Sequence, residues 1–129
     1  MNQYKQEYQQ KLTTAQEAVK IVNSGWGNGM PYELDKELAL RIKADNLTRL
    51  KFRGALVLRQ LFIFDVENAA QHLCWNSWHM SGVERKMIKS GVSFYAPIKY
   101  SELPQYYADL PDPVDVAMFQ VAPMDANGY

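Results

Sequence analysis

Hydrophobic residues recur at fourfold spacing in two segments of the first half of the chain. The apolar positions are Tyr4, Tyr8 and Leu12 in one segment, and Leu34, Leu38 and Ile42 in the other. Mostly polar residues stand between them, so each segment would present one apolar face as a helix. The pattern predicts a helix over residues 3 to 12 and another over residues 31 to 46, which ends at Asn46.

A further helix is predicted between these two, in the sequence LTTAQEAVKIVNSG. Thr14 and Glu17 have the spacing of a capping box, in which two side chains satisfy backbone N–H groups at a helix start. Gly25 is the last residue of this stretch, and glycine is common just past the end of a helix. We therefore predict a helix between Thr14 and Gly25.

The rest of the chain alternates strand and helix patterns. Residues 50 to 58, LKFRGALVL, are predicted to form a strand, because the run is short and holds Gly54 in its middle. Residues 72 to 80 alternate imperfectly between apolar and polar. We predict further strands over residues 92 to 97 and 114 to 123, and helices over residues 83 to 91 and 100 to 110.

Strands that alternate with helices predict an α/β fold with a largely parallel sheet flanked by helices. The last predicted strand, VDVAMFQVAP, is almost continuously apolar, which is typical of a parallel strand covered on both faces. The 129 residues fit one domain. Because the final PMDANGY lacks the helix expected after such a strand, we interpret the chain either as truncated or as ending in a flexible tail.

Composition and charge argue against several classes of protein. Fourteen basic and fourteen acidic residues cancel without forming blocks, which disfavours nucleic acid or an anionic membrane as a partner. The apolar runs are far shorter than the roughly 20 residues of a membrane helix, and the polar start has no signal-peptide core. Cys74 is the only cysteine, so no internal disulfide and no Cys-x-x-Cys metal clip can form. We expect a cytoplasmic protein.

The stretch SGWGNGMP places Gly25, Gly27 and Gly29 just before the helix predicted to start at Pro31. Backbone N–H groups at glycines can approach a ligand closely, so this segment could form an anion or oxyanion pocket. It matches neither GxGxxG after a strand nor a phosphate-binding loop with its Lys-Ser/Thr pair. From spacing alone, a plain turn between two helices is the better interpretation.

The stretch HLCWNSWHM holds two histidines and the cysteine. On a strand, His72 and Cys74 would share one face and His79 would lie on the other, which disfavours a metal site. Asn76 and His79 are candidates for polar contacts to a ligand. A buried, hydrogen-bonded pair is the alternative.

The stretch QVAPMDANGY places polar and turn residues after a predicted buried strand. Gln120, Pro123 and Asp125 would then lie at the carboxyl end of a parallel strand, where α/β proteins bind ligands. The sequence offers no convincing serine, histidine and acid set, and no obvious pair of catalytic carboxylates. The residues alone indicate an α/β domain with a candidate ligand-binding edge.

Several of these segments occur together, in the same order, in one known family. They are TAQEAVKIVNSG, GWGNGMP with ELDKELALR, RGALVL, NSWHMSGVERK, GVSFYAPIKYSELPQYY and VDVAMFQVAPMDANGY. They resemble the amino-terminal domain of the acetyl-CoA hydrolase/transferase family, which includes 4-hydroxybutyrate CoA-transferase and butyryl-CoA:acetate CoA-transferase. The resemblance spans nearly all of residues 1 to 129 and implies an incomplete CoA-transferase-like amino-terminal domain of the NagB/RpiA type.

The resemblance implies an enzyme that moves CoA between an acyl-CoA and a short carboxylate. In this family a glutamate attacks the thioester, and an acyl-glutamyl anhydride and then a glutamyl-CoA thioester form. That glutamate belongs to a second, carboxy-terminal domain, and no glutamate of this chain matches it, so no catalytic residue is assigned. The resemblance further implies that the chain needs this missing domain for activity, that CoA is a substrate with no metal or redox cofactor, and that the full-length protein is a homo-oligomer.

Matching motif positions imply residues that line the substrate and CoA site. They are Gly27, Gly29 and Pro31 in the glycine loop, Asn76 and His79 in the NSWH segment, and Gln120, Pro123 and Asp125 after the last strand. Two positions depart from the family, which often has glutamine at Met30 and serine at Ala122.

A larger departure precedes the glycine loop. The family has a short strand, commonly Asp-x-Val-x-Tyr-Gly, between the helix that ends in Ser-Gly and the loop. Here Ser24-Gly25 runs directly into Trp26-Gly27, so roughly five residues, the length of a short strand, are missing. Either the sheet has lost its first strand, or residues 20 to 28 reorganise to replace it.

Two alternatives to CoA transfer stay open at this point. Acetyl-CoA hydrolysis would result if water took the acyl group, and the sequence does not separate the two reactions. The chain could also be a non-catalytic module that binds CoA-like ligands or a partner chain.

Overall fold

The computed structural model describes residues 3–22, 25–28, 31–109, 113–121, 123–125 and 127, and at 25–28 it describes only the backbone. The α-helices are α1 (Gln3–Lys11), α2 (Ala15–Ala18), α3 (Tyr32–Asp45), α4 (Ala69–His72), α5 (Gly82–Lys89) and α6 (Leu103–Ala108). The 3₁₀ helices are η1 (Val19–Ile21), η2 (Phe62–Asp65) and η3 (Tyr100–Glu102). The strands are β1 (Gly25–Asn28), β2 (Leu50–Gly54), β3 (Leu73–Ser77), β4 (Ser93–Tyr95) and β5 (Val116–Ala117).

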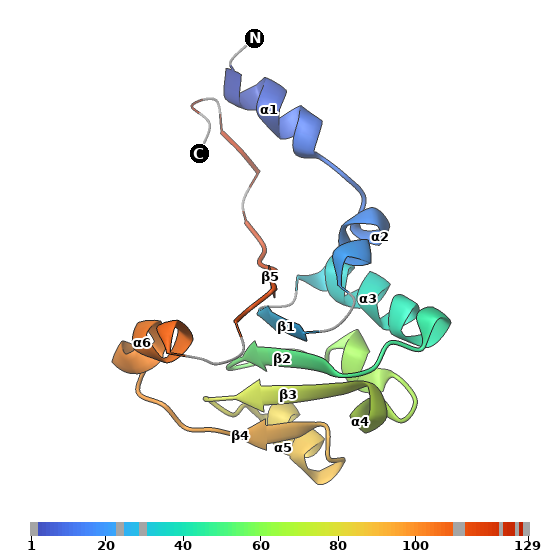
Figure 1. Cartoon of the computed structure of the whole chain (residues 1–129), viewed down its shortest axis with the longest axis vertical. Helices are drawn as coiled ribbons and strands as arrows, with labels where there is room; N and C mark the ends of the chain where they lie inside the picture. The colour runs from blue at the N-terminus through green and yellow to red at the C-terminus, as the bar shows by residue number, and fades with distance from the viewer. Residues whose placement is uncertain are drawn as a thin grey trace.

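The strands form one five-stranded sheet in the order β4-β3-β2-β1-β5. Each pair of neighbouring strands is parallel (Figure 1). Arg53, near the end of β2, is the register partner of Asn76 in β3 and of Asn28 in β1. The predicted α/β class and parallel sheet are confirmed.

One face of the sheet carries the hydrophobic core. Leu50 and Phe52 of β2 and Leu73 and Trp75 of β3 alternate with polar residues and are buried on this face. The predicted apolar stripe of α3 packs into the same core, together with η2 and the start of α4. The Trp75 ring stacks on Phe52 and meets Phe64 edge-on, with centroids 5.8 and 5.2 Å apart respectively. The core therefore joins β2 and β3 to the helices on one side.

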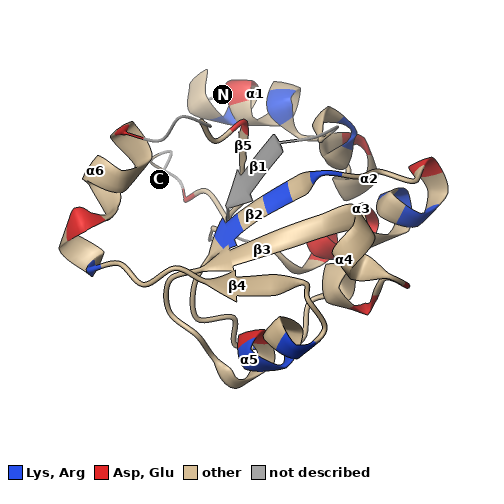
Figure 2. Ribbon diagram, turned by 60° about the horizontal axis from the view of Figure 1, so that its bottom comes forward, with Lys and Arg blue, Asp and Glu red and all other residues tan. Residues whose placement is uncertain are grey.

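The opposite face of the sheet is more polar. Strand β2 has blue, basic segments in Figure 2. Its basic residues are Lys51 and Arg53, and their register partners in β3 are Cys74 and Asn76. Cys74 is exposed, whereas Arg53 and Asn76, closer to the carboxyl ends of the strands, are buried. Helix α6 stands beside this end of the strands (Figures 1 and 2). The buried polar residues are thus at the edge where parallel sheets commonly bind ligands.

The sheet has not lost its first strand. Gly25–Asn28 forms β1 and pairs with β2 along four residues, from Gly25 beside Leu50 to Asn28 beside Arg53. Of the two sequence alternatives, the replacement is therefore correct. Gly25 begins a strand and does not stop a helix, and Gly27 lies within the strand, not in a loop, because pairing with β2 and β5 extends this backbone.

The helix predicted between Thr14 and Gly25 is shorter than expected. The Thr14 hydroxyl accepts a hydrogen bond from the Glu17 N–H at 3.2 Å, which confirms the Thr14 half of the predicted capping box, whereas the Glu17 carboxylate accepts from Lys20 Nζ at 2.6 Å. The α-helix nevertheless ends at Ala18 and tightens into η1. Arg41 of α3 holds this end in place, because its guanidinium donates to the Val19 carbonyl and, at 2.7 Å, to the Val22 carbonyl.

We expect Arg41→Met to destabilise the chain by about 1–3 kcal/mol. The methionine keeps the aliphatic bulk but removes the donor to the Val22 carbonyl and one of two donors to the Val19 carbonyl, which still accepts from the Val22 N–H. Urea unfolding followed by circular dichroism measures the loss. Lys43→Met, at an exposed position of the same helix, is the matched control. Equal stability of the two variants would contradict this role of Arg41.

The other predicted elements are present with changed lengths. The helices predicted over residues 3 to 12 and 31 to 46 are confirmed as α1 and α3, and Asn46 caps α3 with a left-handed backbone. The elements predicted over residues 83 to 91, 92 to 97 and 100 to 110 are confirmed as α5, β4 and η3 with α6. Helix α1 buries no residue and stands apart from the sheet (Figure 1).

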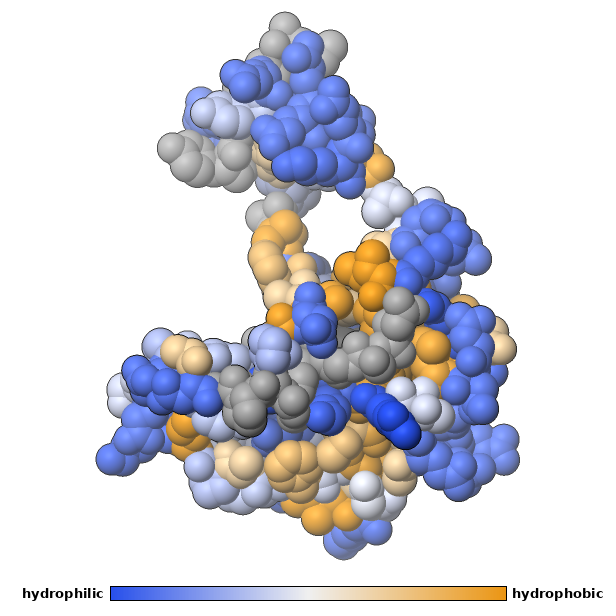
Figure 3. Space-filling model, in the orientation of Figure 1, coloured by the Kyte–Doolittle hydropathy of each residue, from blue (hydrophilic) through white to orange (hydrophobic). Residues whose placement is uncertain are grey.

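Two predicted strands are too long. β2 ends at Gly54 instead of Leu58, and β5 has only two residues. The expectation that residues 114 to 123 are covered on both faces is wrong, since Phe119 is 73% and Val121 70% exposed. The physical reason is that β5 pairs only with β1 among the described strands. Figure 3 shows hydrophobic surface along the segment beyond β5.

The end of β2 requires a glycine because the Trp75 ring lies against it. A Cβ at Gly54 would be 2.4 Å from Trp75 Cζ2, and this ring is buried in the core. We expect Gly54→Ala to cost about 1–3 kcal/mol of stability in urea unfolding. Gly82→Ala, where a Cβ meets nothing within 4 Å, is the control and should not lower the unfolding midpoint.

Candidate functional site

A polar cluster lies at the carboxyl ends of β2 and β3. We call it the Arg53 cluster, and it consists of Arg53, Asn76, Tyr106 and Tyr107. Arg53 is 1% and Asn76 4% exposed. The Arg53 guanidinium carbon is 5.8 Å from the ring centroid of Tyr106 and 5.9 Å from that of Tyr107, both on α6. The cluster thus holds a buried cation against two aromatic faces.

The side chain of Asn76 joins β3 to α6. Its Nδ2 donates to the Tyr106 hydroxyl at 3.3 Å. Its Oδ1 and the Tyr107 hydroxyl are both buried and have no hydrogen-bond partner among the described residues. Burial raises the pKa of the Tyr107 phenol, the Arg53 cation opposes this rise, and Tyr106 adds to it. The Tyr107 hydroxyl is therefore a neutral donor at physiological pH.

The Trp78 ring covers the two tyrosines from the loop after β3. Its centroid lies 6.5 Å from that of Tyr106 and 6.0 Å from that of Tyr107, in edge-to-face geometry. Such pairs stabilise beyond the area they bury. The loop between β3 and α5 therefore contributes an apolar wall to the Arg53 cluster.

Glu84 fixes that loop to the sheet. Its carboxylate is fully buried and accepts hydrogen bonds from Ser77 Oγ at 2.6 Å and Ser81 N at 2.7 Å. It also accepts from Trp75 Nε1 at 3.2 Å and Val57 N at 3.3 Å. Burial raises the pKa of Glu84, but these hydrogen bonds outweigh it and hold the pKa below its usual value. Glu84 is therefore a buried carboxylate that joins the loops after β2 and β3.

His79 lies apart from Asn76. Its side chain is exposed and lines a hollow of about 400 Å³ with Met80, Arg85, Ile88 and Tyr95. Tyr95 is the register partner of Ser77, so it belongs to the α5 face of the sheet and not to the face of Asn76. The structure therefore does not bring the two candidates of the NSWH segment together.

The remaining site candidates fall in three places. Pro31 and Gln120 line a common hollow of about 490 Å³ near the starts of α2 and α3, and Gly27 lies in β1. Gly29 is outside the described residues.

Beyond β5, the Asp125 carboxylate accepts a hydrogen bond from Asn127 N at 2.8 Å. Pro123 is in the same segment. Neither Asn76 nor His79 lines the hollow that Pro31 and Gln120 share.

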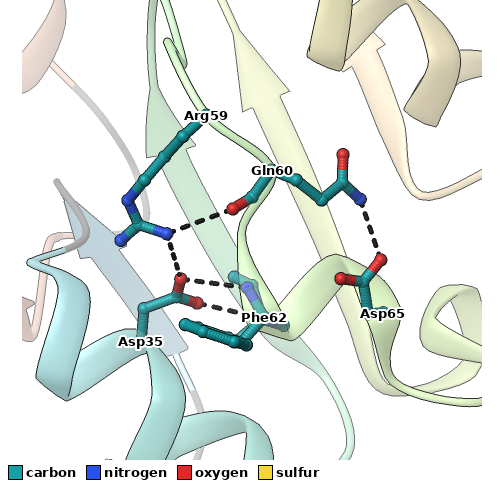
Figure 4. A network of polar contacts seen from close by, with 6 residues as sticks. Asp35, Arg59, Gln60, Phe62 and Asp65 are labelled. Atoms are coloured by element: carbon teal, nitrogen blue, oxygen red, sulfur yellow. Dashed lines mark hydrogen bonds and ion pairs between the residues drawn. The ribbon is translucent and has the colours of Figure 1, made fainter.

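A buried acidic residue of α3 supports the loop that follows β2. Asp35 accepts hydrogen bonds from Phe62 N at 3.0 Å and Ile63 N at 3.2 Å, and it pairs with Arg59 at 3.0 Å (Figure 4). The Arg59 guanidinium lies 4.9 Å from the ring centroid of Tyr32 at the start of α3. The loop is thereby bonded to α3, and it contacts Tyr32, which lines the hollow shared by Pro31 and Gln120.

The sequence interpretation of HLCWNSWHM is wrong for His72. This residue ends α4 and is not part of the strand, so it does not share a strand face with Cys74. Its Nδ1 is 2.8 Å from the Leu47 carbonyl. Among the described residues, no three His, Cys, Asp or Glu side chains lie close enough together to hold a metal ion.

The described helices include none that is long and apolar enough to cross a membrane.

Sequence reasoning missed the residues that make up most of the cluster. Arg53 is the one charged residue of the otherwise apolar sequence FRGALVL, which is only a weak indication that this side chain is buried. Tyr106 and Tyr107 are over 50 residues away in the chain, so only the fold brings them to Arg53. Glu84 belongs to the family motif NSWHMSGVERK, but the sequence did not indicate that its carboxylate is buried.

Comparison with known proteins matches this chain to one family. Residues 1–129 match the family described as acetyl-CoA hydrolase/transferase N-terminal domain. The butyryl-CoA:acetate CoA-transferase of Anaerostipes caccae is 52% identical over 98% of this chain and 29% of its own length. A probable butyrate:acetyl-CoA coenzyme A-transferase of Syntrophomonas wolfei is 38% identical over 96% of this chain and 28% of its own length.

The fold is shared with a solved structure. The crystal structure of RipA from Yersinia pestis matches with a TM-score of 0.80 and 26% identity, over 98% of this chain and 32% of RipA. The chain spans less than a third of the length of these relatives. From the match over its whole length, the chain belongs to the acetyl-CoA hydrolase/transferase family and corresponds to the amino-terminal domain of that family.

Proposed function

We propose that this chain is the amino-terminal part of an acyl-CoA:carboxylate CoA-transferase of the acetate, butyrate and 4-hydroxybutyrate class. The observation that carries the proposal is 52% identity, over 98% of the chain, to a butyryl-CoA:acetate CoA-transferase. The Arg53 cluster supports it, because a buried cation and neutral donors at a sheet edge suit a carboxylate substrate.

The proposed chemistry uses a glutamate from a second domain, in the part of the relatives that this chain does not span. The glutamate attacks the thioester carbonyl and displaces CoA thiolate, which gives a mixed anhydride. The thiolate attacks the glutamyl carbonyl of the anhydride, which releases the first carboxylate and leaves a glutamyl-CoA thioester. An acceptor carboxylate then reverses both steps and leaves as a new acyl-CoA.

The residues of this chain are proposed to bind and position substrates. Glu84 is unsuited to attack a thioester, because four hydrogen bonds occupy its buried carboxylate. We infer that the stretch from Gly27 through Gly29 to Pro31 lies at the thioester end of the site, with Gln120 close to Pro31. Asn76, His79, Pro123 and Asp125 remain proposed substrate or CoA contacts, and a homo-oligomer of the longer protein remains a proposal.

The test is to express the reading frame that contains this chain and to measure exchange of CoA between butyryl-CoA and acetate. The proposal expects acetyl-CoA and butyrate to form in equal amounts. A folded protein that catalyses no exchange, although it carries a second α/β domain, would contradict the proposal.

Hydrolysis is the second candidate, because the description of the matched family names both reactions. Free CoA thiol released from acetyl-CoA in the absence of any acceptor carboxylate measures it. Transfer predicts that little thiol appears with or without an added carboxylate, and that added butyrate is converted to butyryl-CoA. Thiol release that does not depend on the acceptor would favour hydrolysis.

A further inference from the structure

The Arg53 cluster contains more polar groups than the fold itself uses. A buried cation is costly unless its surroundings compensate for lost water, and the faces of Tyr106 and Tyr107 supply part of that compensation. The two tyrosines are only half-buried, so the cluster lies directly below the surface at α6.

The Asn76 amide has one end without a partner in either orientation. As it stands, Nδ2 donates to the Tyr106 hydroxyl and the buried Oδ1 has no partner among the described residues. If the amide is turned over, the Tyr106 hydroxyl donates to Oδ1 and Nδ2 becomes the atom without a partner. Leaving a buried polar atom without a partner costs about 1–3 kcal/mol. A ligand that accepts from Nδ2 would remove this cost.

The Tyr107 hydroxyl adds a second neutral donor. It is buried, has no partner among the described residues, and is carried on the ring that lies against the Arg53 guanidinium. Arg53, Asn76 and Tyr107 therefore offer a cationic donor, an amide donor and a phenol donor in one cluster. A carboxylate has two oxygens with about four acceptor sites, which fits three donors.

We infer that the Arg53 cluster binds the carboxylate group of a short monocarboxylic acid, with Arg53, Asn76 and Tyr107 donating to its oxygens. The apolar tail of the acid then packs on the Trp78 ring, which lies against both tyrosines. This inference rests on the proposed function, in which such an acid is the CoA acceptor. It makes Arg53 a specificity-determining residue for the carboxylate and not for the CoA moiety.

The direct test is an NMR titration of the ¹⁵N-labelled chain with sodium butyrate. We expect saturable chemical-shift changes of the Asn76 side-chain amide and of the Trp78 indole N–H. Asn76 belongs to the Arg53 cluster, and the Trp78 ring contacts Tyr107. Sodium chloride at the same ionic strength and neutral butyramide serve as controls. Shifts that do not saturate, or equal shifts with chloride, would overturn the inference.

Three variants separate the cluster from general charge effects. Arg53→Met should weaken butyrate binding at least about tenfold, because it removes a charged donor. Lys51→Met, on the same strand and the same face two residues earlier, should leave binding unchanged. Tyr107→Phe removes only one hydroxyl, keeps the fold, and should weaken binding about two- to tenfold. If Arg53→Met unfolds the chain, unchanged binding in Tyr107→Phe still refutes the inference.

Kinetics of the longer protein distinguish this inference from the proposed function. If the protein exchanges CoA, Tyr107→Phe should raise KM for butyrate or acetate and leave KM for the acyl-CoA unchanged. Equal increases in both KM values would refute the inference and leave the function intact. If butyrate binds to the chain as predicted but the longer protein exchanges no CoA, the function fails and the carboxylate site stands.

Discussion

Glu84→Ala is expected to be the most destabilising single substitution in the described part of the chain, at about 3 kcal/mol or more. The change removes a fully buried carboxylate and leaves Trp75 Nε1, Ser81 N and Val57 N without this acceptor. Ser77 Oγ loses its shorter hydrogen bond and keeps only the His79 carbonyl, at 3.2 Å. It also removes the capping box of α5. Urea unfolding followed by tryptophan fluorescence measures the effect.

Glu102→Ala is the control, because Glu102 is exposed and its nearest cation is Lys99 at 3.6 Å. It should unfold at the same urea concentration as the unmodified chain. If Glu84→Ala were as stable as this control, Glu84 could not be what holds the loops after β2 and β3 together.

Glu84 should also make stability depend on pH. Burial raises the pKa of Glu84, but the hydrogen bonds that the carboxylate accepts lower this pKa by a larger amount. The folded-state pKa therefore lies below the unfolded-state value of about 4.5. The contribution of Glu84 is therefore complete above about pH 4.5 and is lost as the pH falls through the lower, folded-state value. Glu84→Gln should reduce the acid-induced loss of stability. An unchanged acid limb in this variant would show that Glu84 does not cause it.

Asp35→Ala is expected to have the second largest effect on stability, about 2–4 kcal/mol. Asp35 is fully buried, and its loss removes its ion pair with Arg59 and the acceptor of the N–H groups of Phe62 and Ile63 (Figure 4). Because η2 packs on α3 through these bonds, hydrogen exchange at Phe62 and Ile63 should rise more than exchange in β3.

Asp65→Ala is the matched control for Asp35. Asp65 belongs to the same loop and accepts from Gln60 Nε2 at 2.9 Å, but it is exposed (Figure 4). Its loss should change neither the unfolding midpoint nor the exchange at Phe62. Similar effects of both substitutions would mean that burial of Asp35 is not what makes it important.

The sequence predicted those helices and strands whose ends are marked by residues close by in the chain. The fourfold stripe of Leu34, Leu38 and Ile42 and the glycine after α5 are visible within a few residues. β1 could not be predicted, because GWGN has no strand pattern of its own and is extended by its pairing with β2 and β5. The burial of residues 114 to 123 was overestimated, because an apolar run does not reveal whether a strand lies at the edge of a sheet.

The candidate site was predictable only as far as its motif. The resemblance identified Asn76 and His79, which are three residues apart in the sequence. β3 ends between them at Ser77, so strand alternation no longer relates their directions, and His79 lies in a different hollow. Arg53 gains its role from Tyr106 and Tyr107 on α6, a contact between distant segments that no local pattern encodes.

The central proposal is that this chain supplies the amino-terminal domain of a CoA-transferase, including a site for the carboxylate substrate. The most direct test replaces the matching first part of the Anaerostipes caccae enzyme, which is 52% identical, with this chain and measures CoA exchange between butyryl-CoA and acetate. We predict exchange in the chimera, and in its Tyr107→Phe variant a raised KM for acetate alone. A folded chimera without exchange would contradict the account.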